Sequence, residues 1–517
     1  MAVANVAHIE SRSSLSLCMI VRDCASILEA CLQSIMPWVD EAIIVDTGSN
    51  DDTRDVAIRH GARLFGFSWC DDFSAARNES LRHATSEWIL WMDSDDVIDA
   101  DNGRKLRALV EGPHKPSTLG YIAQVHCPGG DSESPADATV VDHVKVFRNN
   151  PLIRFEGRIH EQVLMPIRRL GGEVEWTDIF VVHSNSDQSD EGREHKYERD
   201  LRILDKDLQD RPDHPFVLFN IGMTFADMQD YSQATDYLQH CLNVSETSES
   251  HVRKAFALLV NALVALERQV EAWDACRRGR ILFPDDMELL FREAMLHHDS
   301  GRLDEAIVAY ETILQSNPER HFTSIDRGIA GYKTRYNLGV VFRDAGRLAL
   351  AEAQWRRVLQ EVPNYRPAWN ALCDLLIGSR RFTTAELLIE QMGAFGECCC
   401  DAMLHRSELY CAIGDYATSI NLVEQALATF PDRIEALHLK CRLLFEHGAS
   451  AEAEEWLTKL VRRSPHDAAA LHNLGIIQMQ VGKKSLATVS FRESLRLRPE
   501  SDETRKRLQQ LTSGEGA

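Results

Sequence analysis

Three carboxylates follow directly on an apolar run near residue 90. The run, residues 88–92, ends at Asp93, and Asp95 and Asp96 come immediately afterwards. Side chains two residues apart project to the same side of an extended chain, so Asp93 and Asp95 can face one ligand. Hard carboxylate oxygens suit Mg²⁺ or Mn²⁺, and such an ion would in turn hold a diphosphate. An acidic turn or helix cap is the common alternative for such a triplet. Its position at the end of a buried strand favours the metal site.

Two further polar segments could contact a ligand. An apolar run over residues 43–45 leads into Asp46, whose carboxylate could accept a hydrogen bond from the N–H of a base. The small residues that follow also form a typical strand–helix joint with an N-cap at 49–51. Residues 71–78, DDFSAARN, place Arg77 in a predicted helix among small side chains that leave room for a ligand. A surface salt bridge is the alternative use of this arginine.

Alternating strands and helices must position these residues. Short apolar runs alternate with helical patterns over residues 14–188, which is typical of βα units and predicts an α/β domain with a mainly parallel sheet. We expect strands buried on both faces over residues 15–21, 42–45 and 88–92. Helices are expected between them over residues 27–35, 53–60 and 73–83. Ligands of open α/β sheets bind at the carboxyl ends of the strands, so Asp46 and Asp93 are expected at one sheet edge.

A different period begins near residue 213. Prolines recur 34 residues apart at Pro284 and Pro318, and again at Pro431, Pro465 and Pro499. A 34-residue helix–turn–helix period is that of tetratricopeptide repeats, and it is too regular for a generic helical bundle. The sequence therefore predicts an all-α solenoid of about eight repeats.

The repeats have one irregularity and one clear packing pattern. The spacing between Pro318 and Pro363 is longer than the period and predicts an 11-residue insertion around residues 321–331. In the last repeat, Gly475 would let two helices approach closely, with Ala487 and Phe491 packed between them. Such repeats rarely carry out chemistry, but they supply a concave surface for a polypeptide.

Composition excludes several classes of protein. With 57 basic and 79 acidic residues the chain carries a net charge of −22, which argues against a nucleic-acid-coating role. No apolar run is long enough for a signal peptide or a membrane span, so a cytoplasmic protein is expected. The predicted domains are a disordered tail (1–13), an α/β domain (14–188), a linker helix (189–212), the repeat solenoid (213–500) and a C-terminal tail (501–517).

The order of three motifs resembles a known family. VDTGSND at residues 45–51, AARNES at 75–80 and WILWMDSDD at 88–96 resemble family 2 glycosyltransferases of the GT-A fold. The resemblance covers residues 14–188. Together with the repeats, it looks like the bacterial branch that is fused to tetratricopeptide repeats and is similar to the sublancin-type peptide S-glycosyltransferases.

The resemblance implies a UDP-sugar site that holds Mn²⁺ or Mg²⁺. It implies that Asp46 contacts the uracil, that Arg77 lies beside the nucleotide, that Asp93 faces the ribose and that Asp95 binds the metal. Asn78 and Ser94 are assigned to the same nucleotide-sugar site.

Two later segments complete the implied site. GT-A enzymes usually carry a catalytic base on an acid after the sheet, and often a metal-binding histidine near the end of the domain. Glu161 and His183 match these places, and His160 is the alternative base. His160–Glu161 is not a zinc-protease motif, because Leu164 stands where that motif has its second histidine. Buried structural histidines are the alternative interpretation of His160 and His183.

The sequence thus predicts a metal-dependent inverting glycosyltransferase that moves a sugar from a UDP-sugar to a protein or peptide acceptor held by the repeats. A transferase for a surface glycan or lipid carrier is one alternative, and a repeat scaffold with an inactive transferase domain is another. A nucleotidyltransferase would need a triphosphate-binding loop, which the sequence does not contain. The repeats could also mediate formation of a homo-oligomer.

Overall fold

The structure is a computed structural model, and it describes residues 13–127, 139–183, 190–316 and 325–513. Residues 1–12 of the predicted tail (1–13) and residues 321–324 of the predicted insertion lie outside the described residues. The chain divides into two compact units, Met1–Ala345 and Gly346–Ala517. All of the predicted site residues belong to the first unit.

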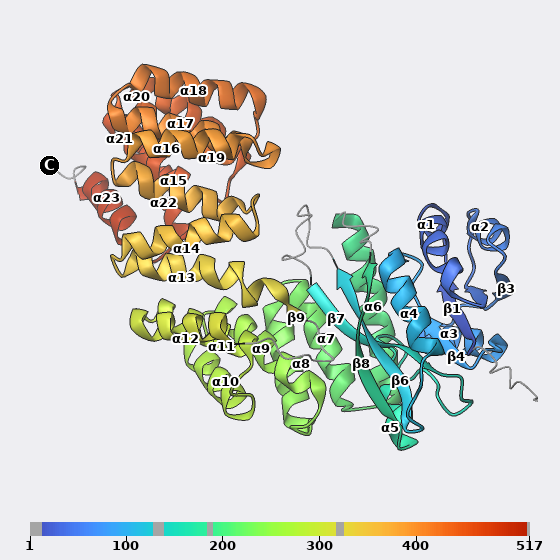
Figure 1. Ribbon diagram of the computed structural model, residues 1–517. Coiled ribbons are helices and arrows are strands. Elements are labelled where there is room, and N and C mark those ends of the chain that lie inside the picture. The colour runs from blue at the N-terminus through green and yellow to red at the C-terminus, as the bar shows by residue number, and fades with distance from the viewer. Residues whose placement is uncertain (1–12, 128–138, 184–189, 317–324, 514–517) are drawn as a thin grey trace, which may run out of the picture. The chain divides into compact units, whose positions relative to one another are not determined.

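A mixed β-sheet forms the centre of the first unit (Figure 1). Its strands are β1 (Leu15–Val21), β2 (Glu41–Asp46), β3 (Arg63–Gly66), β4 (Trp88–Trp91), β5 (Asp96–Val97), β6 (Thr118–Cys127), β7 (Thr139–Arg148), β8 (Glu173–His183) and β9 (Ile325–Asp326). The strand order is β3-β2-β1-β4-β7-β6-β8-β5, and β9 pairs with β7. β1 to β4 are parallel, whereas β7 runs antiparallel to both β4 and β6. The predicted α/β class is confirmed, but the sheet is mixed: β6 and β8 also pair in parallel, whereas β7 and β5 run antiparallel to their neighbours.

Alternating side chains give the sheet two buried faces. The helices around it are α1 (Ala25–Ile35), the 3-10 helix η1 (Met36–Trp38), α2 (Thr53–Arg59), α3 (Phe73–His83), α4 (Ala100–Glu111) and α5 (Leu164–Arg169). Leu17 and Met19 pack with α1 and α4 on one face, whereas Cys18 and Ile43 pack with α3 and α5 on the other. A strand buried on both faces needs apolar side chains at nearly every position, which explains the continuous apolar run of β1.

Helix α6 (Asp190–Asp210) follows the sheet and packs against the first of a series of paired helices. Those of the first unit are α7 (Pro215–Asp227), α8 (Tyr231–Val244), α9 (Ser250–Ala265), α10 (Gln269–Leu282), α11 (Met287–Asp299), α12 (Leu303–Gln315), the 3-10 helix η3 (Arg327–Ala330) and α13 (Tyr332–Asp344). Leu204 of α6 is buried with Val217 and Ile221 of α7, so one apolar cluster joins α6 to the repeats.

The second unit continues the helix pairs. Its helices are α14 (Leu348–Glu361), α15 (Arg366–Gly378), α16 (Phe382–Gly393), the 3-10 helix η4 (Gly396–Cys398), α17 (Cys399–Ile413), α18 (Tyr416–Thr429), α19 (Ile434–Glu446), α20 (Ser450–Arg463), α21 (Ala468–Gln480), α22 (Lys484–Leu497) and α23 (Asp502–Ser513). A Cβ atom at Gly475 would lie 2.7 Å from the Phe491 ring, so glycine is what allows α21 and α22 to approach. Among the described helices, none has both the length and the apolar character that crossing a bilayer requires.

Candidate active site

A buried arginine joins two carboxylates beyond the carboxyl end of β4. Arg77 lies on α3; its Nη2 donates to Asp93 Oδ1 at 2.6 Å, and its Nε donates to Glu161 Oε1. The guanidinium lies 4.4 Å from the centre of the Trp91 ring, and the residue is only 5% exposed. Although burial opposes the charged form, Asp93 and Glu161 raise the pKa of Arg77 above its ordinary value. One strand end, one helix and one loop are thereby held together by a single cation.

The surroundings of the third guanidinium nitrogen of Arg77, Nη1, indicate a ligand. Nη1 is buried and has no hydrogen-bond partner among the residues that the structure describes. Leaving a buried charged donor unpaired is costly, so such groups in native proteins usually meet an ordered water, an ion or a ligand oxygen. An anionic oxygen is the partner that a guanidinium binds best.

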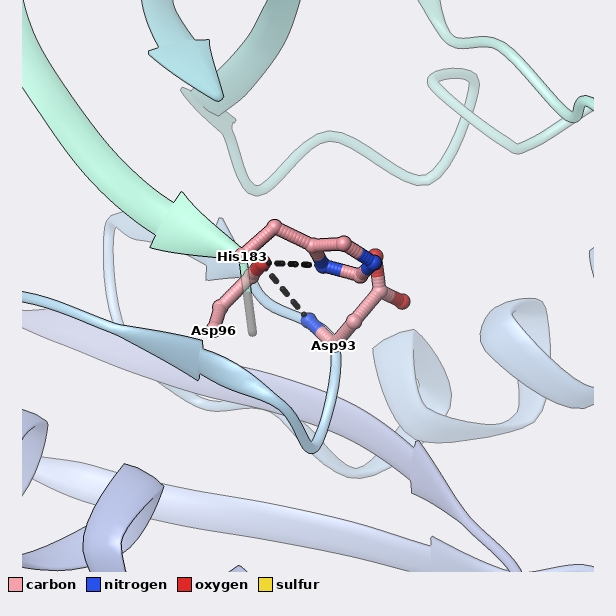
Figure 2. A group of neighbouring side chains, drawn as sticks. All are labelled: Asp93, Asp96 and His183. Carbon is pink, nitrogen blue, oxygen red and sulfur yellow. Dashed lines mark hydrogen bonds and ion pairs between the residues drawn. The ribbon is translucent and has the colours of Figure 1, made fainter. Parts of the chain in front are cut away.

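A second cluster of charged residues lies beside the first (Figure 2). Asp93, Asp96 and His183 each offer a ligand atom within 4.8 Å of the others. His183 ends β8; its Nδ1 is 3.0 Å from Asp96 Oδ1, and its Nε2 is 3.3 Å from Asp95 Oδ2. Asp96 is fully buried, and Nζ of Lys145 on β7 donates to its Oδ2 at 2.8 Å. Three carboxylates therefore share a small volume with one lysine and one histidine.

The pKa shifts in this cluster differ in direction between neighbouring carboxylates. Burial raises the pKa of Asp95 to about 6, opposed by His183 and reinforced by Asp93 and Asp96. Although burial also acts on Asp96, Lys145 and His183 hold its pKa below the usual range. The hydrogen bond to Asp96 raises the pKa of His183. A divalent cation would favour the ionised form of Asp95, and carboxylate oxygens with one imidazole are a donor set that fits Mn²⁺ or Mg²⁺.

A cavity of about 430 Å³ opens next to Arg77. Its sheet-domain side includes four of the nine predicted site residues, namely Arg77, Asp93, His160 and Glu161. Its other side comes from α6, α7 and α9, and it includes Lys196, Arg199, Phe216, Phe219, Met223 and Lys254. The first repeat therefore forms one wall of the cavity that contains the predicted catalytic residues.

The remaining predicted residues have other surroundings. Asp46 ends β2, is 5% exposed, and accepts a hydrogen bond from the Ser49 amide at 3.1 Å. Asn78 uses both ends of its amide on the Phe155 backbone, donating to the carbonyl at 3.0 Å and accepting from the amide at 2.8 Å. Asn78 thus holds the loop that follows β7 against α3. Ser94 lies in the turn after β4, beside the Cys24 thiol.

Helix α6 holds the loop that carries His160 and Glu161. The Arg158 amide donates to Asp207 Oδ2 at 3.3 Å, and the Arg158 side chain pairs with Asp210 at 2.6 Å. Ile159 is buried in the apolar cluster that α6 shares with α7. His160 has a φ of 54°, in the left-handed region, and burial lowers its pKa. The conformation of this loop therefore depends on α6 and on the first repeat.

Sequence reasoning assigned no role to Asp96 and missed two other residues of the site, Lys145 and His143. Asp96 and Lys145 form a fully buried ion pair, and His143 lines the cavity. Burial, reinforced by Lys145, lowers the pKa of His143 to about 4, so its imidazole is neutral. Residues two apart on a strand share a face, and the strand VDHVKVF carries a histidine and a lysine in this relation. A lysine within a buried strand was the signal that could have revealed this face.

Comparison with known proteins identifies the class. The model of Glycosyl transferase family 2 matches residues 16–154. Tetratricopeptide repeat models match residues 217–248, 288–320 and 412–477. The chain is a glycosyltransferase, with a family 2 domain followed by tetratricopeptide repeats.

Individual proteins of known sequence or structure are similar to parts of the chain. The chain is 28% identical over 358 residues to a TPR repeat-containing protein of Synechococcus elongatus, covering 68% of this chain and 76% of that one. It is 24% identical over 316 residues to the SPbeta prophage-derived glycosyltransferase SunS of Bacillus subtilis, covering 58% and 72%. A crystal structure of a tetratricopeptide repeat protein from Parabacteroides merdae, 17% identical, aligns with a TM-score of 0.39 over 50% of this chain and 98% of that one.

Proposed function

We propose that the protein is a metal-dependent inverting glycosyltransferase that moves a sugar from a UDP-sugar to a protein or peptide acceptor held by the repeats. The observation that carries the proposal is the cavity beside Arg77. It brings Glu161 and Asp93 into one space with a wall supplied by the first repeat. Donor chemistry and acceptor binding would thus share one site.

The donor would bind along the carboxyl edge of the parallel strands. Asp46 ends β2 and Asp93 follows β4, two strands that both pair with β1. The unpaired Nη1 of Arg77 suits an oxygen of the diphosphate. Asp95 and His183, together with Asp93 and Asp96, would hold Mn²⁺ or Mg²⁺, and the ion would offset charge on the departing UDP.

Glu161 would act as the base. Its Oε1 accepts from Arg77 Nε, which fixes the carboxylate and leaves Oε2 for a proton. As an acceptor hydroxyl or thiol attacks, a bond forms to the anomeric carbon while the bond from that carbon to the diphosphate oxygen breaks. The acceptor proton passes to Glu161 and UDP leaves with the electron pair. Attack opposite the leaving group inverts the anomeric centre.

The wall from α7 has the character of a polypeptide-binding surface. Phe216, Phe219 and Met223 are three and four residues apart, so they lie on one face of the helix. Aromatic rings and the flexible thioether side chain of methionine can contact varied apolar side chains. Lys196 and Lys254 border this face and could pair with carboxylates or carbonyl oxygens of a bound chain.

The test combines donor turnover with mass analysis of acceptors. The full chain is incubated with a panel of UDP-sugars and Mn²⁺ or Mg²⁺, and UDP release is followed. Candidate polypeptides are then examined for the added mass of one sugar. Donor turnover without addition to any polypeptide, but with addition to a glycan or lipid carrier, would replace the proposed acceptor class.

Variants of the α7 wall separate the two steps. Met223→Gln should reduce transfer to a polypeptide about tenfold, because it removes an apolar contact, and should leave donor hydrolysis within twofold. Met228, 41% exposed at the end of the same helix and outside the cavity lining, provides the matched control Met228→Gln. Equal effects of the two substitutions would show that the α7 wall does not bind the acceptor.

A further inference from the structure

The insertion that interrupts the repeats returns to the catalytic sheet. Within it, β9 pairs antiparallel with β7, with Ile325 opposite Val140 and Asp326 opposite Thr139. The 3-10 helix η3 follows immediately and contacts α11, α12 and α13. Residues 325–330, the strap, thus link helices α11, α12 and α13 to a strand of the transferase domain.

The strap occupies a particular position along β7. One edge of β7 pairs with β6 along almost its whole length. The other edge pairs with β4 at residues 146–148 and with β9 at residues 139–140. The intervening segment, residues 141–145, carries Val141 and His143 of the cavity and Lys145, the partner of Asp96. The strap therefore fixes the end of β7 that β4 does not reach, next to the residues that line the cavity.

Arg327 extends this contact to two more strands. Its Nη2 donates to Gln124 Oε1 at 2.9 Å and lies 3.3 Å from His126 Nε2, both on β6. The His126 ring stacks on Phe180 of β8 at 4.3 Å between centroids and 4° between planes. Burial, reinforced by Arg327, lowers the pKa of His126 to about 4, so the ring that stacks is neutral. Phe180 precedes His183 of the charged cluster by three residues on the same strand.

The other side of the strap is anchored in the repeats. Asp326 pairs with Lys333 of α13 at 2.7 Å, and its Oδ1 caps η3 by accepting from the Gly328 amide at 2.9 Å. Ile329 is buried, and its carbonyl accepts from the Thr334 hydroxyl. The strap is therefore held from two sides, by the sheet through the β9 pairing and Arg327, and by the repeats through Asp326 and Ile329.

We infer that the strap is a positioning device for transfer and that Arg327 is its positioning residue. The contact between α6 and α7 is the first attachment of the repeats to the transferase domain, and the strap is a second one that follows about three helix pairs later. Two attachments fix the separation between β7 and the cavity wall made by α7 and α9, whereas one would let the wall pivot. The expected effect on acceptor affinity rests on the proposed function; the expected effect on β7 does not.

The experiment compares Arg327→Ala, Arg327→Lys and Gln124→Ala in the full chain. For Arg327→Ala we expect the acceptor KM to rise about three- to tenfold, with kcat and donor hydrolysis within twofold. Amide hydrogen exchange in residues 139–145 should become faster. Arg327→Lys keeps a cationic donor group and should restore much of the affinity for the acceptor. The double variant Arg327→Ala/Gln124→Ala should raise the acceptor KM no more than the more damaging single variant, because both substitutions break the same contact. Arg277→Ala is the control, since Arg277 pairs with Asp274 on its own helix.

Each outcome decides the inference. Faster exchange in β7 together with a raised acceptor KM supports it. Faster exchange with an unchanged KM would reduce the strap to a structural role, and unchanged exchange would overturn the inference altogether. If no polypeptide acceptor exists, the proposed function fails in the mass analysis, while the exchange experiment still decides whether the strap holds β7.

Discussion

Replacing the carboxylate of Glu161 by an amide tests the proposed chemistry most directly. Glu161→Gln keeps an oxygen that can accept the hydrogen bond from Arg77 Nε, so the loop and the arginine should stay in place. The substitution removes the site for the acceptor proton. General bases contribute about 10²–10⁴-fold to rate, which corresponds to about 3–5 kcal/mol of transition-state stabilisation. We expect transfer to fall by that factor and the Kd for UDP to change less than threefold.

The assay is single-turnover transfer under saturating donor, with UDP binding measured calorimetrically on the same protein. The matched control is His160→Asn, because residue 160 has a φ of 54° and asparagine tolerates the left-handed region better than most side chains. The transfer rate of this control should stay within about fivefold of that of the unsubstituted protein. Loss of a general base would lower the rate by at least about 10²-fold, so the two cases can be told apart. A larger loss for His160→Asn than for Glu161→Gln would assign the base to the imidazole. A Kd for UDP that weakens as much as transfer does would show that Glu161 acts on donor binding.

Three further perturbations follow from the charged and buried groups. Asp95→Asn or excess EDTA should reduce UDP-sugar turnover to less than a hundredth of the rate of the unsubstituted protein with metal. Full turnover in EDTA would exclude a role for the metal in catalysis. Lys145→Met leaves Asp96 buried without its ammonium partner, so urea unfolding should show a loss of about 3–5 kcal/mol that Asp96→Asn partly reverses. Burial, reinforced by His214, lowers the pKa of His251 from 6.5 to about 4, so protonation favours the unfolded chain. The stabilisation is complete above about pH 6.5 and falls by up to about 3 kcal/mol towards pH 4, a slope that His251→Phe should flatten.

The parallel half of the sheet was predictable because its signal is local. Strands buried on both faces need continuous apolar runs, and β1, β2 and β4 have them. The carboxylates at their ends follow from chain order alone. The repeat period is equally local, since Gly475 and Phe491 meet at a fixed spacing within one helix pair. Each of these features can be recognised within a short stretch of sequence, a single strand or a single helix pair.

The β7-β6-β8-β5 half of the sheet and the cavity wall depend on contacts between distant segments. Lys145 is an ordinary strand residue until β7 lies beside β4 and brings its ammonium to Asp96, 49 positions away in the chain. The bridge from Arg77 to Glu161 spans 84 positions, and that from Arg327 to Gln124 spans 203. No periodicity links such pairs, so the sequence indicated the residue types at the site but not their partners. The spacing also predicted the insertion in the repeats without indicating that it would form a strand of the catalytic sheet.

Helix α6 shows why the two parts of the chain cannot be assigned separate roles. Its apolar spacing predicts a helix that links domains, yet Asp207 and Asp210 on it bind Arg158 in the loop of Glu161. Ile159 of that loop packs on Val217 of α7, so the loop is stabilised from beyond the linker. A chain cut after α6 would expose this apolar contact and disturb the base as well as the acceptor wall. Loss of transfer in such a fragment would therefore not identify the repeats as the acceptor-binding part. Single substitutions on the cavity-facing side of α7 leave the loop contacts intact, and for that reason they can separate acceptor binding from catalysis.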